Sequence, residues 1–222
     1  MFQMILAETL PDVVAAETDA GAQARPVDAD AAAASTRGDY GRVSRWALGL
    51  LGTAGAALAT LLAAFPLSLV GSGDDAGDLV FGAIFVAVAL AIGIPSVWLL
   101  VALHRSGRRL SRAAGYWAAL PYRLGRRAPR RGDWFAVRFL GFSSDLLLRL
   151  ISSVLAGLAA IFTLVGAVRA IATGAPAWEV VLWLAWGVLF TAVCVGQFGG
   201  VQRIQNGHTA RDPWTFARRN RR

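Results

Sequence analysis

Four long apolar stretches, separated by polar connections, dominate the pattern of the chain. Residues 46–73, 79–103, 150–168 and 180–202 contain no Asp, Glu, Lys, Arg or His. A helix needs about 20 residues to cross the hydrocarbon core of a bilayer. All four stretches reach this length, the third only just, and we therefore predict four transmembrane helices.

Helices are the expected form of these stretches because a backbone inside lipid must satisfy its own hydrogen bonds. The strands of a membrane barrel would alternate apolar and polar residues, and these stretches do not. A soluble protein of 222 residues would also have too little polar chain to cover four such helices. The predicted fold class is an all-α membrane protein, a bundle of four transmembrane helices.

The positions of the arginines predict the orientation of this bundle. Residues 104–149 contain eleven arginines and two acids, and residues 203–222 contain six arginines and one acid. The connections 71–78 and 170–179 contain no arginine. Short basic loops stay on the cytoplasmic side of a membrane. We therefore expect a multi-pass protein of the cell (inner) membrane with both termini and the central loop in the cytoplasm.

These boundaries divide the chain into five parts. They are a tail (1–45), a first transmembrane hairpin (46–103), a basic loop (104–149), a second hairpin (150–202) and a basic tail (203–222). The first tail contains seven acids and four arginines, has few large apolar side chains and shows no apolar period. Such a composition is typical of disorder, and we expect a disordered acidic cytoplasmic tail.

The basic loop is expected to contain helical structure of its own. The second transmembrane helix is predicted to continue beyond residue 103 and to stop at Pro121, which breaks helices. Further on, Phe135, Phe139, Phe142 and Leu146 recur at the spacing of one helix face. This stripe predicts an amphipathic helical segment, either lying in the membrane interface or packed on the ends of the transmembrane helices.

Aromatic and arginine residues of this loop are candidates for contact with lipid or with a protein partner. Arginines bind phosphates of anionic headgroups, and aromatic rings favour the depth of the headgroups. Nucleic acid is not expected, because transmembrane helices tether the loop at both ends. The candidate contact residues are Arg123, Arg126, Arg127, Arg130, Arg131, Trp134, Phe135 and Phe139.

Three further residues have structural interpretations. Arg169 and Glu179 stand at the two ends of the second short connection, and we expect them to form an ion pair across it. The alternative is that Arg169 reaches the aqueous surface alone. Pro95 lies within the second apolar stretch and removes a backbone hydrogen bond there, so we expect a helix kink.

Catalytic and cofactor-binding patterns are not found. The apolar stretches contain no acid or histidine away from their ends, which disfavours a proton relay or a carboxylate ion site. The two histidines, His104 and His208, are too few for a metal site without further ligands, and we interpret them as interfacial or solvated. No cofactor and no enzymatic activity are expected.

These patterns favour a structural, regulatory or assembly protein of the membrane. Its basic cytoplasmic face would dock anionic lipid or an acidic protein partner. A small-solute transporter or channel acting as a homo-oligomer is the alternative. No apolar stretch contains a polar stripe long enough to line a pore, which counts against that alternative.

Overall fold

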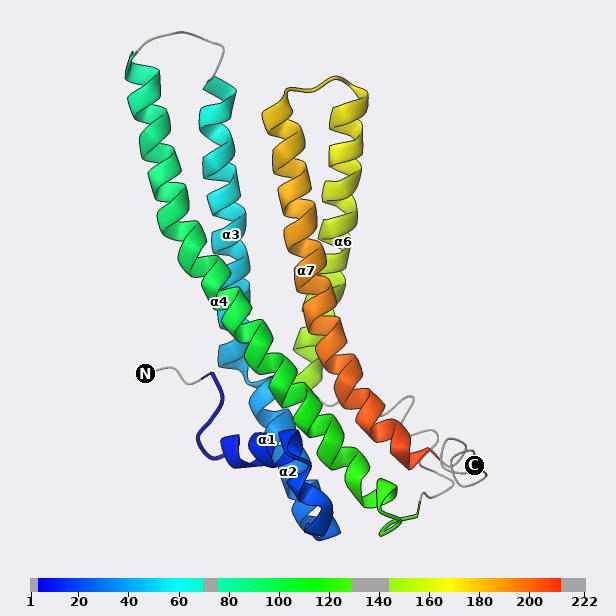
Figure 1. Ribbon diagram of the computed structural model, residues 1–222. Helices are drawn as coiled ribbons and strands as arrows, with labels where there is room; N and C mark the ends of the chain where they lie inside the picture. Colours follow the sequence, from blue (N-terminus) through cyan, green and yellow to red (C-terminus); the bar gives the residue numbers. More distant parts are fainter. Residues whose placement is uncertain (1–3, 70–75, 129–143, 213–222) are drawn as a thin grey trace. The chain divides into compact units, whose positions relative to one another are not determined.

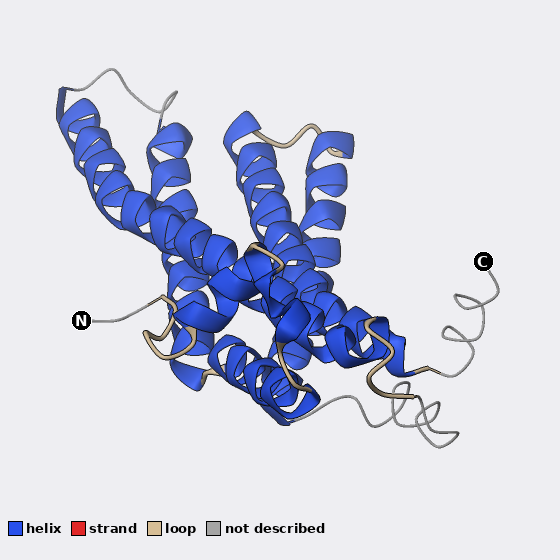
Figure 2. Ribbon diagram, turned by 60° about the horizontal axis from the view of Figure 1, so that its bottom comes forward, coloured by secondary structure: helices blue, strands red, loops and turns tan. Residues whose placement is uncertain are grey.

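Every element of the described residues is a helix. The structure, a computed structural model, describes residues 4–69, 76–128 and 144–212 (Figures 1 and 2). The elements are α1 (Leu10–Glu17), η1 (Ala20–Gln23), α2 (Pro26–Gly41), α3 (Val43–Leu69), α4 (Ala76–Arg123), α6 (Ser144–Ala172), α7 (Ala177–His208) and η3 (Thr209–Arg211). The prediction of an all-helical chain is confirmed for these residues.

Four helical stretches are long and apolar enough to cross a membrane, as the sequence predicts. They involve α3, α4, α6 and α7. Helix α4 has 48 residues. At 1.5 Å per residue it is about 72 Å long, more than twice the thickness of a hydrocarbon core. A large part of α4 must therefore extend beyond the membrane if the apolar part crosses it.

The chain divides into two compact units. One comprises Met1–Trp46, Leu103–Leu150 and Gln197–Arg222, and we call it the basic unit because every arginine except Arg169 falls within it. The other comprises Ala47–Ala102 and Ile151–Gly196, and we call it the apolar unit.

Within the apolar unit, small residues bring α3 and α4 close together. A Cβ atom added at Gly52 would lie 3.1 Å from the Leu100 side chain. One added at Gly93 would lie 3.1 Å from the Cβ of Ala59. Helices in lipid associate through such close contacts, because apolar side chains gain little by leaving lipid for protein.

Side-chain hydrogen bonds join α7 to two other helices of the apolar unit. Trp186 Nε1 donates to Thr60 Oγ1 at 2.8 Å on α3 and lies 3.1 Å from the carbonyl oxygen of Ala57. Ser153 Oγ on α6 donates to the carbonyl oxygen of Cys194 at 3.1 Å. A polar group satisfied in this way avoids the cost of exposure to hydrocarbon.

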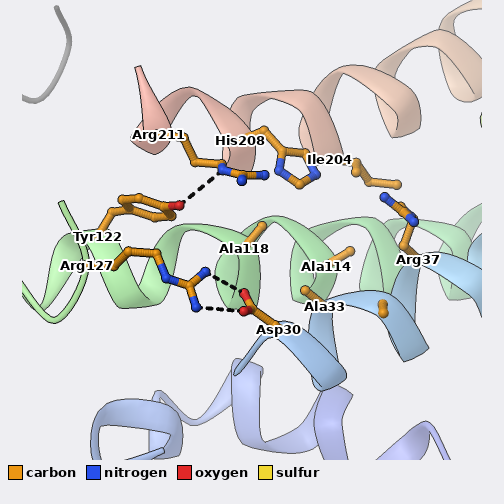
Figure 3. A pocket seen from close by; sticks show the side chains of 11 residues that line it. Asp30, Ala33, Arg37, Ala114, Ala118, Tyr122, Arg127, Ile204, His208 and Arg211 are labelled. Carbon is orange, nitrogen blue, oxygen red and sulfur yellow. Dashed lines mark hydrogen bonds and ion pairs between the residues drawn. The ribbon is translucent and has the colours of Figure 1, made fainter. Parts of the chain in front are cut away.

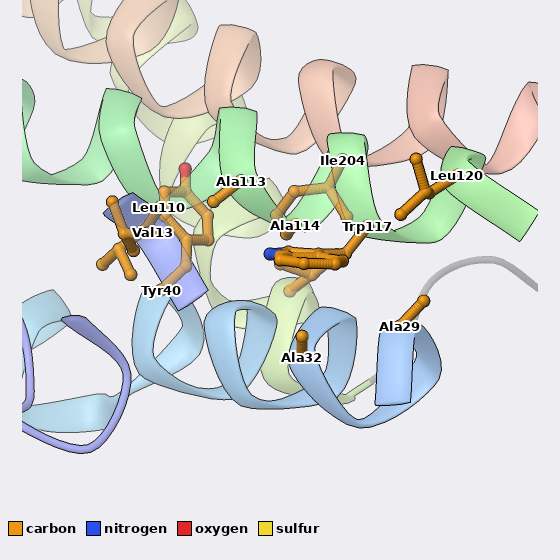
Figure 4. Packing of buried hydrophobic residues seen from close by; sticks show 11 residues of the cluster. Val13, Ala29, Ala32, Tyr40, Leu110, Ala113, Ala114, Trp117, Leu120 and Ile204 are labelled. Atoms are coloured by element: carbon orange, nitrogen blue, oxygen red, sulfur yellow. The ribbon is translucent and has the colours of Figure 1, made fainter. Parts of the chain in front are cut away.

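The basic unit has an aromatic and aliphatic core, shown in Figure 4. Helices α1 and α2 lie against the C-terminal part of α4 (Figure 1). The indole of Trp117, on α4, packs against α1 and α2, and its Nε1 donates to the carbonyl oxygen of Asp12 at 2.9 Å. The core residues are Val13, Ala29, Ala32, Tyr40, Leu110, Ala113, Ala114, Trp117, Leu120, Leu146 and Ile204.

The structure corrects the expectation that residues 1–45 are disordered. From residue 4 onward this segment contains α1, η1 and α2 and contributes Val13 and Tyr40 to the core. Composition alone was misleading because the few apolar side chains of the segment are buried in a core shared with α4. Alanine-rich α2 has high helix propensity, and its small side chains approach Trp117 on α4 closely.

The sequence explains where α2 begins and why η1 lies so close to α4. Pro26 occupies the first turn of α2, where a missing N–H costs nothing. At Gly21, an added Cβ would lie 2.7 Å from the Trp117 ring. Glycine is therefore required at this position, because any side chain would push the indole away.

Two predictions for the central loop have different outcomes. Helix α4 does continue beyond residue 103, but it passes Pro121 and ends at Arg123. A proline in the last turn disturbs only the end of a helix, so it does not stop α4 at once. Phe135, Phe139 and Phe142 lie outside the described residues, and the amphipathic helix stays a prediction. Leu146, at the start of α6, is buried in the core of the basic unit.

Candidate functional site

A small cavity lies within the basic unit, between α2, the end of α4 and the end of α7 (Figure 3). Its volume is about 110 Å³. Alanines and Ile204 form part of its wall. The ionisable and hydroxyl-bearing lining residues are Asp30, Arg37, Tyr122, Arg127, His208 and Arg211.

A bidentate ion pair closes one side of the cavity. Arg127 Nη2 lies 2.7 Å from Asp30 Oδ2, and Arg127 Nη1 lies 3.0 Å from Asp30 Oδ1. The hydrogen bonds to Asp30 raise the pKa of the Arg127 guanidinium. Both side chains are partly exposed, so the pair adds little stability. At the cavity, two guanidinium nitrogens of Arg127 bind both oxygens of the Asp30 carboxylate, so this carboxylate is already paired.

The Tyr122 ring lies between two guanidinium groups. The central carbons of Arg127 and Arg211 each lie 5.9 Å from the centre of the ring. Arg211 Nε also donates to Tyr122 Oη at 3.1 Å. The aromatic face attracts both cations, and the hydrogen bond fixes the direction of the Arg211 guanidinium. Tyr122 thus holds Arg211 in one position at the cavity.

Donor groups remain available at the opposite wall. An arginine has five N–H donors. Of the donors of Arg211, only Nε–H has a hydrogen-bond acceptor among the described residues. The imidazole of His208 lies beside it in Figure 3, three residues earlier in the chain. Neither ring nitrogen of His208 has a hydrogen-bond partner among residues 4–69, 76–128 and 144–212. Both side chains therefore offer donors to the cavity.

Glycines set the spacing of α4 and α7 beside the cavity. A Cβ atom added at Gly207 would overlap the backbone of Gly115. One added at Gly115 would lie 2.8 Å from the carbonyl oxygen of Arg203. The two helix backbones are in direct contact here. Any larger residue must separate the helices and change the width of the cavity.

A second group of arginines in the basic unit has a structural role. Arg45 donates to the carbonyl oxygen of Met4, to Leu103 at 3.3 Å and to Ser106 Oγ at 2.9 Å. The guanidinium of Arg149 lies 4.3 Å from the centre of the buried Tyr40 ring. These arginines connect the N-terminal segment to the long helices through contacts within the protein.

The predicted contact residues fall into two groups. Arg127 pairs with Asp30, and Arg126 donates to the carbonyl oxygens of Ala24 and Ala22, the latter at 2.8 Å. Both thus bind the N-terminal helices. Arg123 is exposed at the end of α4. The others, Arg130, Arg131, Trp134, Phe135 and Phe139, lie outside the described residues, and lipid or partner contact stays a prediction for the whole set.

The predicted ion pair and kink also stay predictions. The Glu179 carboxylate accepts a hydrogen bond from Trp183 Nε1 at 3.4 Å on its own helix. Nothing described tests its pairing with Arg169. Pro95 lies inside α4, whose helical assignment continues on both sides of it.

No known protein family, curated protein or solved structure matches this chain. The arrangement of the residues is therefore the basis for assigning a function. Within the described ranges, no group of three or more His, Cys, Asp or Glu residues is placed to hold a metal ion. The cavity presents three arginines, a histidine, a tyrosine and the Asp30 carboxylate, which Arg127 binds.

Sequence reasoning found only part of this site. It identified Arg127 as a binding residue and treated His208 as solvated. The spacing of Ile204, His208 and Arg211 places them on one side of a helix end, and this was a usable signal. The pairing of Asp30 with Arg127 joins residues 97 positions apart, and no local pattern indicates it.

Proposed function

We propose that this chain is an integral membrane protein of structural, regulatory or assembly type whose basic unit docks anionic lipid headgroups. The cavity lined by Arg37, His208 and Arg211 is the observation that supports this proposal. An acidic protein partner is the alternative ligand. We place the basic unit in the cytoplasm, at the inner face of the cell membrane, because basic connections are retained there.

A stripe of exposed arginines favours lipid as the ligand. Arg105, Arg108 and Arg112 follow directly after the apolar part of α4, and their side chains are exposed. Their spacing of three and four residues places them on one face of the helix. A basic residue near an anionic leaflet gains about 1 kcal/mol. This stripe begins where the apolar stretch ends, which is the position expected for contact with headgroups.

The test is lipid preference of the full chain in nanodiscs. Wild-type protein is expected to enrich phosphatidylglycerol over phosphatidylcholine in its annulus, measured by native mass spectrometry of released lipid. Replacing Arg105, Arg108 and Arg112 together with Gln should lower this enrichment several-fold. The matched control replaces the same three residues with Lys, which keeps the charge and should keep most of the preference.

Two outcomes would contradict the proposal. Equal amounts of both lipids around the wild-type chain would show that no anionic lipid is preferred. A preference that survives in the Gln variant would remove the arginine stripe from the explanation. Salt-sensitive binding of an acidic protein, without lipid preference, would favour the alternative ligand.

A further inference from the structure

We infer that the cavity between α2, α4 and α7 is a binding site for a single phosphate group, presented by a lipid headgroup or by free inorganic phosphate. The inference deepens the proposed function and rests on it where the phosphate belongs to a lipid. The groups that would bind the phosphate are the guanidinium of Arg211, the imidazole of His208 and the hydroxyl of Tyr122.

The balance of charge at the cavity favours an anion. Three arginines and one carboxylate line it. That carboxylate, on Asp30, is bound through both oxygens by Arg127. Asp212 is buried next to Arg211 in the chain, but it is not one of the lining residues. Arg211 therefore faces a space whose only lining carboxylate is already engaged.

The donors lie together at one end of the cavity. Figure 3 shows His208, at the end of α7, next to Arg211 of η3, and Arg211 next to the Tyr122 hydroxyl of α4. Phosphate oxygens accept several charge-assisted hydrogen bonds, and guanidinium groups match their geometry. The terminal nitrogens of Arg211 and the ring of His208 supply donors that no described residue uses.

The volume is sufficient for one small oxyanion. A single water needs about 10–15 Å³ of such volume, so a cavity of about 110 Å³ has room for a tetrahedral phosphate group. The rest of a phospholipid would lie outside the cavity.

The site is preorganised. The Tyr122 hydroxyl fixes Arg211, the Asp30 carboxylate fixes Arg127, and the backbone contact of Gly115 with Gly207 sets the distance between two walls. A ligand that enters does not have to order these groups again. Preorganisation of this kind raises affinity without adding contacts.

The first test uses inorganic phosphate and the full chain in phosphatidylcholine nanodiscs. Phosphate should raise the temperature of unfolding, followed by tryptophan fluorescence, and chloride at equal ionic strength should not. Arg211→Gln should weaken the apparent affinity for phosphate about tenfold, which corresponds to one charge-assisted hydrogen bond. The affinity of Arg211→Lys for phosphate should lie between those of wild type and Arg211→Gln. Lysine keeps the charge but lacks the planar guanidinium that forms two parallel hydrogen bonds. Arg25→Gln, on an exposed arginine outside both the cavity and the arginine stripe, is the matched control and should bind as wild type does.

The second test identifies the source of the phosphate group. Nanodiscs of phosphatidylcholine with phosphatidic acid are prepared without free phosphate, and lipid retained by the protein is measured by native mass spectrometry. Retention lost in Arg211→Gln, and displaced by inorganic phosphate, would assign a lipid headgroup. Stabilisation by inorganic phosphate without retention of phosphatidic acid would assign a soluble phosphate. Either result supports the site.

The inference is overturned if wild-type protein responds to phosphate as it does to chloride and retains no phosphatidic acid that depends on Arg211. It is also overturned if Arg211→Gln and Arg25→Gln bind phosphate equally well. These results leave the phosphatidylglycerol preference of the arginine stripe unaffected. Conversely, loss of that preference with phosphate binding intact would refute the proposed function and keep a site for soluble phosphate.

Discussion

The interiors of the two units are built from different residues. In the apolar unit the buried side chains are mostly small, among them Ala56, Ala59, Ala156 and Ala160. In the basic unit Trp117, Tyr40 and Leu110 are buried together. On the surface of the apolar unit, by contrast, large apolar side chains are exposed. Phe162 and Trp98 are each 69% exposed.

This difference shows which solvent each unit is suited to. In water, burying a large apolar side chain stabilises a fold by about 25 cal/mol per Å² of area. In lipid that gain disappears, and helices associate through small residues and hydrogen bonds. The apolar unit follows the second rule, with Trp186 bonded to Thr60, and the basic unit follows the first, with Trp117 at its centre.

The largest expected effect comes from removing a tryptophan in each unit. Trp117→Ala should cost about 3–5 kcal/mol, because it empties the core of the basic unit and breaks the hydrogen bond to Asp12. Trp98→Ala, in the apolar unit, should change stability little, since the ring is 69% exposed. Amide exchange of α1 and α2 measures the first variant, and thermal unfolding in nanodiscs measures both. Equal losses in the two variants would remove the distinction between the units.

The second prediction concerns the glycine contact between α4 and α7. Gly207→Ala should destabilise the basic unit by about 1–3 kcal/mol, the usual cost of overpacking, although alanine favours helix. The matched control is Gly38→Ala on α2, where an added Cβ meets nothing within 4 Å. That control should gain stability, about 0.5–1 kcal/mol. Denaturation followed by tryptophan fluorescence separates the two, and a stabilised Gly207→Ala would show that the backbones are not in contact.

The division between the units also decides what sequence reasoning found. The apolar helices were predicted because long uncharged stretches have one physical meaning, and their count is confirmed. The structure shows in addition that small residues of these helices are buried, among them Ala59, Ala156 and Ala160. Lipid-facing segments can be predicted from the sequence because lipid excludes most structures other than a long apolar helix.

The basic unit was not predictable in the same way. Its N-terminal helices share their core with α4, and their own composition resembles that of a disordered segment. The cavity is formed by residues that are far apart in the chain, such as Asp30, Arg127 and Arg211. No periodic pattern within a single segment predicts that these residues lie close together. The excess of arginine indicated topology, and only the structure separated arginines that bind within the protein from those that line the cavity.

The third prediction tests the hydrogen bond between Trp186 and Thr60, which joins α7 to α3 in the apolar unit. Trp186→Phe and Thr60→Val each remove one partner of the 2.8 Å bond, and the double variant removes both. The coupling free energy from the four proteins should be about 0.6–1.7 kcal/mol, as found for hydrogen bonds between membrane helices. Unfolding in mixed detergent micelles measures it. A coupling near zero would mean that the hydrogen bond to Thr60 contributes nothing and that the contact of the indole N–H with the Ala57 carbonyl is sufficient.

The smallest effect is a pH dependence that only the basic unit should show. Arg109 Nε donates to Glu17 Oε1 at 2.7 Å, and this hydrogen bond lowers the pKa of Glu17 below its ordinary value of 4.5. A carboxyl whose pKa is lowered by folding contributes stability above its unfolded pKa. That contribution is lost as the pH falls through the folded pKa. Both side chains are nearly half exposed, so the contribution should stay below about 1 kcal/mol.

The measurement compares wild type with Glu17→Gln by amide protection factors in α1. The two proteins should differ at pH 7, where the wild-type pair is charged, and converge below the folded pKa of Glu17. Protection of α6 and α7 beside the Ser153–Cys194 hydrogen bond should not change between wild type and variant, because no titrating group takes part in that bond. A difference in α1 that persists at low pH would mean that Glu17 acts through its shape rather than its charge. The link between α1 and α4 would then depend on the same kind of packing as the apolar unit, and the contrast between the two units would be weaker at this contact.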